Sequence, residues 1–208
     1  FNILYFNIKY LKRSFMNFLG HFYLGRYSED LLLGNFIADA VKGSKYNLYP
    51  EGIKQGILQH RFIDDFTDNH PAYLVGKRRM YEKLPKVSGI VMDILYDHLL
   101  WLNWKHHFSF SPDLFIDSCH DILDKKINEM SPRIKHMYYH MRKNSWLVNY
   151  QHEEGLNWAI KGIGKRIVPD INLEEFNLIF HQNKELYLNE FDVFFQDIFI
   201  KSKEYLER

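Results

Sequence analysis

Apolar residues recur at steps of three and four positions along most of this chain. That spacing places them on one face of an α-helix, where they can be buried together. A clear example is the set Ile90, Ile94, Leu95, Leu99 and Leu102. No segment alternates apolar and polar residues with a period of two between turn residues, so the pattern predicts no β-strand. The chain is therefore expected to be all-α.

Polar caps and prolines indicate where the predicted helices begin and end. Ser28, followed by two acidic residues, fits an N-cap, and Gly43 fits a C-terminal stop. Asn172 opens a final helix that is expected to reach about Leu206. Further starts are indicated by prolines at a first helical position, namely Pro50, Pro71, Pro112 and Pro132. Together these signals predict a single helical domain of about seven or eight helices joined by short loops.

Composition narrows the class of protein. A length of 208 residues suits one domain, and 25% charged with 46% hydrophobic residues is typical of a folded chain. Lys and Arg number 27 against 26 Asp and Glu, so the net charge of +1 gives no overall argument for nucleic-acid binding. The single cysteine, Cys119, excludes an intramolecular disulfide framework and indicates a reducing compartment.

Targeting signals are missing from the sequence pattern. No stretch approaches the ~18 uninterrupted apolar residues that a membrane-spanning helix needs. The apolar segment 1–10 has its charges mainly after it, whereas a secretory signal has them before. We therefore expect a cytoplasmic protein that has no membrane anchor. Met16 opens a more regular segment, so residues 1–15 are predicted to be an N-terminal extension and residues 16–208 the functional domain.

Histidine and aspartate concentrate in two predicted helices. His60, Asp64 and Asp68 follow one another at four-residue steps, which aligns them on one helix face. Asp93 and Asp97 repeat this spacing inside a strongly apolar segment. An exposed pair at helical spacing contributes only ~0.2–0.5 kcal/mol and is common on solvated surfaces, so either segment alone fits that interpretation.

Taken together, the acidic side chains point to a metal site. A carboxylate on a mostly apolar helix must be solvated, protonated, paired or bound to a metal, because an isolated buried charge is very costly. Arg61 is the one cation within these two segments, and His21 and Asp39 lie in further apolar segments. Imidazole and carboxylate ligands together suit Mn²⁺, Fe²⁺, Zn²⁺ or Mg²⁺.

Four blocks of the sequence resemble a known family. They are 16–21 (MNFLGH), 34–43 (GNFIADAVKG), 56–71, which contains HRFID and FTDNHP, and 93–98 (DILYDH). In order and spacing these blocks resemble the bacterial acyl carrier protein phosphodiesterases. Gly20 stands where members of that family usually carry Ala.

The resemblance implies a fold and an activity. The family is considered a divergent branch of the HD-type phosphohydrolases, which are all-α and metal-dependent. Its members hydrolyse the phosphodiester that joins 4′-phosphopantetheine to a serine of acyl carrier protein, commonly with Mn²⁺. The motif order here differs from a plain His…His-Asp…Asp series, since Arg61 follows His60 and Asp97 precedes His98. The assignment of individual ligand roles therefore stays open.

The residue pattern and the resemblance together yield a candidate site. The predicted metal ligands are His21, Asp39, His60, Asp64, Asp93 and Asp97. Arg61 is expected to neutralise a phosphate oxygen. His98 is the candidate acid for the leaving serine oxygen, and Asp68 is expected to orient it or the attacking water.

The expected partner is acidic, because acyl carrier proteins carry a strong negative charge. A docking surface should then be locally basic, and Lys77, Arg78 and Arg79 form the favoured patch. Arg142 with Lys143, and the segment 161–166, are alternatives. Two other functions remain open at this stage. One is an HD-like phosphohydrolase acting on a nucleotide or another small phosphodiester, and the other is a non-catalytic helical module that binds an acidic partner.

Overall fold

The computed structural model describes residues 18–164 and 171–208, and these ranges are helical without any β-strand. The all-α prediction is confirmed. The predicted N-terminal extension, residues 1–15, lies outside the described residues. No helix of the described part of the chain is both long and apolar enough to cross a membrane.

The described residues form twelve α-helices and three short 3₁₀ helices. The first half contains α1 (Phe18–Gly25), α2 (Glu29–Ile37), η2 (Ala38–Ala40), η3 (Gly43–Leu48), α3 (Glu51–Asn69), α4 (Pro71–Tyr81) and α5 (Ser88–Leu102). The second half contains α6 (Trp104–His107), α7 (Pro112–Lys125), η4 (Ile127–Glu129), α8 (Pro132–Lys143), α9 (Trp146–Asn149), α10 (Glu153–Gly164), α11 (Leu173–Gln182) and α12 (Lys184–Leu206).

The predicted count of seven or eight helices was too low. Two of the additional helices, α6 and α9, are single turns of four residues. The predicted final helix from Asn172 to Leu206 is in fact two helices, broken at Asn183. The Asn183 side chain donates a hydrogen bond to the carbonyl of Ile179 at 2.8 Å. Such a local side-chain bond competes with the helical pattern and favours a break.

Most of the predicted helix starts lie where the caps indicated. The Ser28 hydroxyl accepts a hydrogen bond from the Leu31 N–H at 3.1 Å, and Asn172 does the same for Glu175 at 3.1 Å. Pro71, Pro112 and Pro132 each open a helix, whereas Pro50 is the residue just before α3. Gly43 has a φ of 57°, a left-handed conformation that favours glycine. It is the first residue of η3 and not the end of the helix that follows Ser28, because α2 already ends at Ile37.

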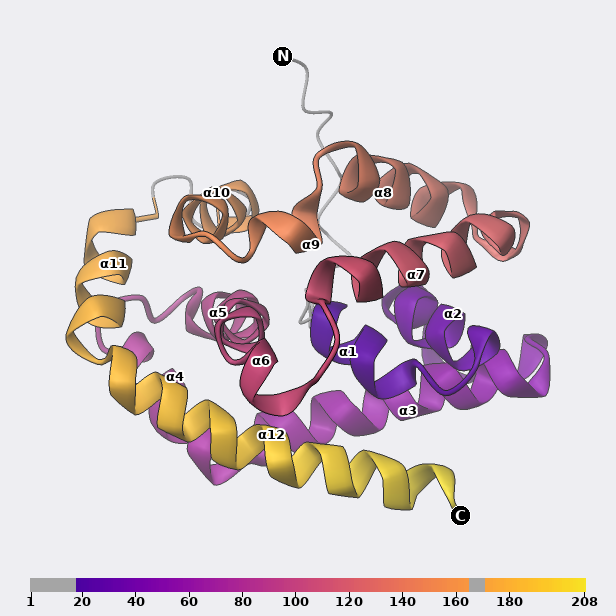
Figure 1. Ribbon diagram of the computed structural model, residues 1–208, viewed down its shortest axis with the longest axis horizontal. Helices are drawn as coiled ribbons and strands as arrows, with labels where there is room; N and C mark the ends of the chain where they lie inside the picture. The colour runs from indigo at the N-terminus through magenta and orange to yellow at the C-terminus, as the bar shows by residue number, and fades with distance from the viewer. Residues whose placement is uncertain (1–17, 165–170) are drawn as a thin grey trace.

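Helix α5 forms the centre of the core. Val91, Met92, Ile94, Leu95 and Leu99 are each 0% exposed. In Figure 1, α5 is seen nearly end-on, with α10 above it, α12 below it and α1 to its right. Because its sides are covered by neighbouring helices, polar groups on α5 must find partners inside the protein.

Helices α2 and α3 cross at unusually short range through a pair of glycines. A Cβ atom added to Gly34 would lie 2.7 Å from the Gly56 Cα, and one added to Gly56 would lie 2.4 Å from the Leu31 carbonyl oxygen. Only residues without a side chain allow the two backbones to approach this closely. The crossing holds α2 against the half of α3 that continues into His60 and Asp64 (Figure 1).

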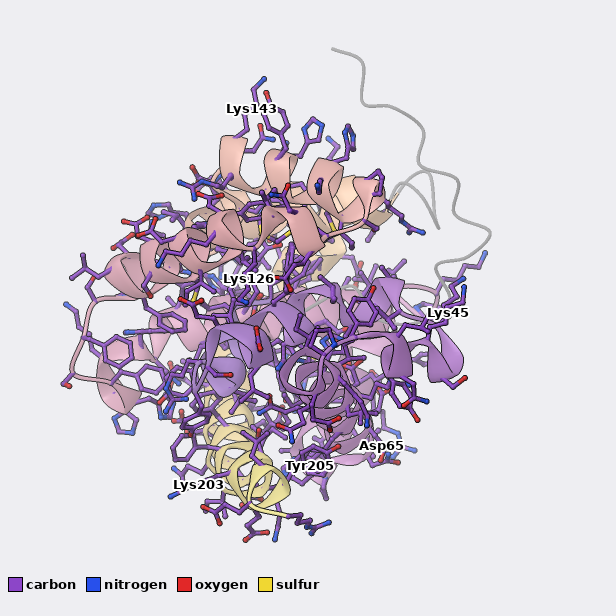
Figure 2. All side chains as sticks on the ribbon, turned by 90° about the vertical axis from the view of Figure 1, so that its right-hand side faces the viewer. Lys45, Asp65, Lys126, Lys143, Lys203 and Tyr205 are labelled. Carbon is purple, nitrogen blue, oxygen red and sulfur yellow. The ribbon has the colours of Figure 1, made fainter. Side chains whose placement is uncertain are left out.

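Charged side chains are spread over the surface rather than gathered on one face. In Figure 2, Lys45, Lys143 and Lys203 lie at separate edges of the same view, and Asp65 lies between two of them. A binding surface for a charged partner must therefore be local.

Candidate metal centre

Three separate segments meet at one cluster of potential ligands. His21 comes from α1, His60 and Asp64 come from α3, and Asp39 comes from η2. One nitrogen or oxygen atom from each of His21, His60 and Asp64 lies within 4.8 Å of the others. Within the described ranges, this is the one group of three or more His, Cys, Asp or Glu side chains close enough to share a metal ion.

The two imidazole rings are stacked and share one carboxylate. The ring centroids of His21 and His60 are 3.9 Å apart, with an angle of 18° between the planes. Nε2 of His21 lies 3.2 Å from Oδ1 of Asp64, and Nε2 of His60 lies 3.2 Å from Oδ2 of Asp64. Asp39 adds a second carboxylate, with its Oδ1 3.4 Å from Nε2 of His60.

The rings are buried, whereas the carboxylates reach the surface. The side chains of His21 and His60 are 1% and 7% exposed, but those of Asp39 and Asp64 are 26% and 31% exposed. The cluster is therefore open to solvent from the carboxylate side. An ion or a substrate can approach from that side without unfolding the core.

Mutual interactions shift the pKa values of the cluster. Burial alone would lower the pKa of His60, but the charges of Asp64 and Asp39 outweigh burial and raise that pKa to about 10. Burial opposes ionisation of Asp64, yet His60 and the His21 ring hold the Asp64 pKa well below its usual range. Burial and the neighbouring His60 cation lower the pKa of His21. The geometry thus favours one positive charge between the carboxylates.

The ring nitrogens of His60 have unused ligand capacity beside the two carboxylates. Nδ1 and Nε2 of His60 are both buried, and neither makes a hydrogen bond, although oxygens lie 3.2 and 3.4 Å from Nε2. Buried polar atoms usually have a partner, so an orphaned ring nitrogen next to two carboxylates needs an explanation. Two imidazoles and two carboxylates are a donor set that Mn²⁺, Fe²⁺ or Zn²⁺ accepts.

Asp93 lies near the cluster without joining it. It accepts a hydrogen bond from the Tyr73 hydroxyl at 2.8 Å. Burial raises the pKa of Asp93 to about 8, the Tyr73 bond opposes this, and the charges of Asp64 and Asp68 add to it. The charge of Asp64 therefore contributes to the raised pKa of Asp93. Asp93 is not among the three side chains whose ligand atoms lie within 4.8 Å of one another.

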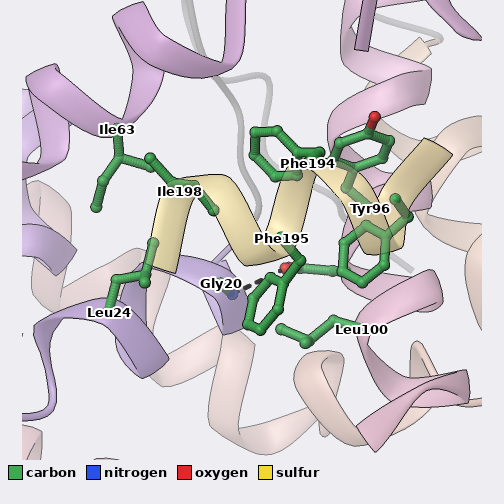
Figure 3. Close-up of a pocket in the computed structure, with 10 residues that line it drawn as sticks. Gly20, Leu24, Ile63, Tyr96, Leu100, Phe194, Phe195 and Ile198 are labelled. Atoms are coloured by element: carbon green, nitrogen blue, oxygen red, sulfur yellow. Dashed lines mark hydrogen bonds between the residues drawn. The ribbon is translucent and has the colours of Figure 1, made fainter. Parts of the chain in front are cut away.

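Asp97, one of the predicted metal ligands, has backbone partners at the start of α1. Its carboxylate accepts backbone N–H bonds from Leu19 and Gly20, both at 3.1 Å, at the start of α1. It therefore satisfies free N–H groups at a helix N-terminus. The same carboxylate borders a cavity of about 10 Å³ whose other walls are mostly apolar, among them Leu24, Tyr96 and Phe195 (Figure 3). That space is too small for a substrate.

The other predicted catalytic residues are spread around the molecule. His98 is 1% exposed, and its Nδ1 lies 2.6 Å from the carbonyl oxygen of Tyr150, on the side of α5 that faces α10. Asp68 is exposed and pairs with Lys77 at 3.5 Å. Arg61 donates a hydrogen bond to the Val41 carbonyl at 2.7 Å, which holds it beside the segment that carries Asp39. Of the three, Arg61 is the one held beside a segment that contributes to the cluster.

The predicted basic patch is largely neutralised. Besides the pair between Lys77 and Asp68, Arg79 makes a two-point contact with Glu190 at 2.6 and 3.1 Å. Arg78 is exposed and has no ion pair among the described residues. One of the three side chains is therefore free to meet an acidic partner.

Sequence analysis missed two buried amides next to the cluster. Asn35 and Gln59 are 1% and 0% exposed, and Asn35 contacts His21 directly. The available signal was polarity, because an amide in an apolar segment needs a buried partner. Asn35 stands among Leu, Phe and Ile residues, and Gln59 directly precedes His60.

Comparisons with known proteins identify the family of this chain. The model of a family described as "Acyl carrier protein phosphodiesterase" matches residues 16–198. A curated protein of that name from Photorhabdus laumondii is 29% identical over 152 residues, covering 73% of this chain and 77% of its own length. Proteins of the same name from an Enterobacter species and from Salmonella agona are 28% identical over 155 residues, covering 73% of this chain and 79% of theirs. No solved structure matches, so the resemblance to HD-type folds stays a prediction.

Proposed function

The chain belongs to the acyl carrier protein phosphodiesterase family, and we propose that it removes the 4′-phosphopantetheine group from holo-acyl carrier protein by hydrolysis. Such an enzyme is a phosphoric diester hydrolase. The observation that carries the proposal is the cluster of His21, His60 and Asp64, which lies inside the matched residues 16–198. This cluster places nitrogen and oxygen ligands at one solvent-accessible point.

Four side chains are proposed to hold a divalent cation, namely His21, Asp39, His60 and Asp64. A bound divalent cation lowers the pKa of water from 15.7 towards ~7 and polarises a phosphoryl oxygen. Mn²⁺ is the first choice for the test, with Mg²⁺, Fe²⁺ and Zn²⁺ as alternatives. Asp97 is left out of the set because backbone N–H groups already bind its carboxylate.

The reaction consumes one water molecule for each phosphodiester. The water oxygen bonds to phosphorus, the bond between phosphorus and the serine oxygen breaks, and the serine oxygen takes up a proton. The products are 4′-phosphopantetheine and the apo-protein. One N–H of Arg61 is occupied by Val41, and the other guanidinium N–H groups are proposed to bind a non-bridging phosphate oxygen.

The protein substrate is proposed to dock in part through Arg78. Acyl carrier proteins are acidic, and Arg78 is the exposed cation of the patch that has no ion pair among the described residues. Lys77 and Arg79 contribute less, because Asp68 and Glu190 already offset their charges. A single exposed charge acts mainly on the rate of encounter.

Incubation of the purified protein with Mn²⁺ and holo-acyl carrier protein tests the proposal directly. We expect mass spectrometry to show conversion of the holo-protein to the apo-protein together with free 4′-phosphopantetheine. Parallel reactions with a panel of nucleotides test the alternative function as a small-molecule phosphohydrolase. Turnover of a nucleotide without any change in the carrier protein would overturn the proposed substrate, and no turnover of either would overturn the proposed reaction.

A further inference from the structure

A chain of buried polar side chains runs from α12 to the metal cluster. The Gln59 amide nitrogen lies 2.9 Å from the Ser202 hydroxyl oxygen, and the Asn35 amide nitrogen lies 2.7 Å from Oε1 of Gln59. Oδ1 of Asn35 then lies 3.3 Å from Nδ1 of His21. Ser202, Gln59 and Asn35 are 1%, 0% and 1% exposed.

Two backbone carbonyls determine which way each amide points. The Gln59 amide nitrogen also donates to the carbonyl of Leu24 at 2.9 Å, and the Asn35 amide nitrogen donates to the carbonyl of Leu31 at 3.0 Å. A carbonyl oxygen can only accept, so neither amide can be turned over without setting two oxygens against each other. The oxygen of Asn35 must therefore face His21.

This orientation determines the tautomer of His21. Oδ1 of Asn35 has no hydrogen to offer, so the 3.3 Å contact is a hydrogen bond only when Nδ1 of His21 carries the proton. In a neutral ring the proton is then absent from Nε2. The Nε2 lone pair is thereby directed at the Asp64 carboxylate, 3.2 Å away. The other tautomer would instead donate its Nε2–H to Asp64, so Asn35 and Asp64 compete for the one proton of the neutral ring. A cation bound by both Nε2 and Asp64 removes that competition.

We propose that Asn35, held in place by Gln59, is a positioning residue that keeps the proton on Nδ1 of His21 and so presents Nε2 as a metal ligand. The inference rests on the cation site proposed above. It assigns a task to two residues that contact neither the ion nor the substrate. Outer partners of this kind orient a ligating imidazole and raise its basicity.

The packing around Asn35 makes room for its side-chain amide. A Cβ atom added to Gly25 would lie 2.7 Å from the Asn35 amide nitrogen, so the glycine makes room for this side chain. The close crossing at Gly34 and Gly56 brings α2 near enough to α3 for Asn35 to reach Gln59. Two apolar side chains in place of Asn35 and Gln59 would fill the same space without hydrogen-bond partners from three helices.

Nuclear magnetic resonance of the ¹⁵N-labelled, metal-free protein tests the first part of the proposal. Imidazole nitrogens with and without a proton have well-separated ¹⁵N shifts, so the His21 signals report its tautomer directly. We expect the proton on Nδ1. A proton on Nε2 would overturn the proposal, and this readout requires neither metal nor catalysis.

Two substitutions at one position separate positioning from packing. Asn35→Leu removes the oxygen acceptor that faces His21. Asn35→Asp keeps that acceptor, while its second oxygen faces the Leu31 carbonyl and Oε1 of Gln59, so a loss of stability is expected in this variant without loss of the contact to His21. By titration calorimetry with Mn²⁺, we expect Asn35→Leu to bind about 10- to 100-fold more weakly and Asn35→Asp to retain most of the affinity. Equal affinity and an unchanged tautomer in Asn35→Leu would overturn the proposal. If Asn35→Leu does not fold, two measurements still test the proposal: the tautomer of His21 in the wild type and the Mn²⁺ affinity of Asn35→Asp.

Ser202→Ala is the matched control for loss of a buried hydrogen bond in the same network. It removes the contact with Gln59 that lies farthest from His21. We expect lower stability with an unchanged tautomer and Mn²⁺ affinity. A wild-type protein that has the Nδ1 proton yet binds no Mn²⁺ would overturn the cation site proposed above while leaving the assignment of the proton intact.

Discussion

The imidazole rings of His21 and His60 lie 3.9 Å apart, and their Nε2 atoms face opposite oxygens of one carboxylate, that of Asp64. Two imidazolium ions cannot be stacked this way without strong repulsion, and the pKa values of the two rings accordingly shift in opposite directions. His60 holds a proton and His21 is neutral at pH 7. The cluster therefore carries one cationic ring between carboxylates.

Cation binding should release this proton. With a pKa raised to about 10, His60 is protonated at neutral pH, and a nitrogen that carries a proton cannot ligate a metal. We expect about one proton to be released per Mn²⁺, and the affinity to rise about tenfold per pH unit between pH 6 and 8. Calorimetry in two buffers of different ionisation enthalpy measures the released protons. An affinity that does not change over this range would contradict His60 as a ligand.

Adjacent aspartates offer a matched pair for testing the ligand set. The Asp64 side chain faces both imidazoles, whereas the Asp65 side chain is exposed and the Asp65 backbone carbonyl accepts a hydrogen bond from Asn69. We expect Asp64→Asn to lower Mn²⁺ affinity and phosphodiesterase activity by about 100-fold or more, because it removes a charged ligand. Asp65→Asn should match the wild type in the same mass-spectrometric assay. Similar activity in both variants would remove Asp64 from the proposed site.

The Asp97 carboxylate should make stability depend on pH. Burial raises its pKa from 3.8 to about 7, while the N–H groups of Leu19 and Gly20 act in the opposite direction. A carboxyl group with a raised pKa in the folded state stabilises the fold most below pH 4, and this contribution is lost as pH rises to 7. We expect the contribution to fall by about 4 kcal/mol over that range.

Chemical denaturation of wild type and Asp97→Asn across this pH range measures the effect. The difference in unfolding free energy between the two proteins should change with pH, because asparagine does not titrate. A constant difference from pH 4 to pH 7 would show that Asp97 has an ordinary pKa.

The crossing of α2 and α3 should not tolerate a methyl group. In Gly56→Ala the new Cβ would lie 2.4 Å from the Leu31 carbonyl oxygen, so the helices must separate. We expect a loss of stability of about 1–3 kcal/mol. Gly162→Ala is the control, since no atom of the described residues lies within 4 Å of its added Cβ and alanine favours helices. Thermal unfolding of both variants checks this, and an equal Tm for the two would refute the tight crossing.

Reversing one exposed charge tests the docking proposal. Arg78→Glu should raise KM for the carrier protein several-fold at low salt and less at high salt, with kcat little changed. Lys203→Glu, in the last turn of α12 where Lys203 lies 4.0 Å from Glu207, makes the same charge change as a control. If both variants raise KM equally, the effect reflects net charge and not docking at α4.

Local chemistry made parts of this structure predictable. The cap at Ser28 and the helix-opening Pro71, Pro112 and Pro132 act within a few residues, so the sequence alone indicates them. The four-residue spacing of His60 and Asp64 likewise determines that they share a helix face.

Contacts between distant segments were not predictable from spacing. The periodicity places Asp97 on a helix face but does not show that α1, 78 residues earlier, begins against it. Arg79 and Glu190 are 111 residues apart in the sequence. The sequence around the predicted basic patch therefore did not indicate that Glu190 offsets the charge of Arg79. Asn35 and Gln59 meet only because two glycines let their helices touch.

The hydroxyl of Ser202 closes the polar network from the last helix, although every proposed ligand lies between residues 21 and 64. A nascent polypeptide leaving the ribosome displays those ligands long before α12 has emerged from the exit tunnel. Until then the Gln59 amide lacks one of its partners, but its bonds to Leu24 and Asn35 do not depend on α12. The last helix therefore adds to the stability of the folded chain and is not needed to turn the Asn35 oxygen towards His21.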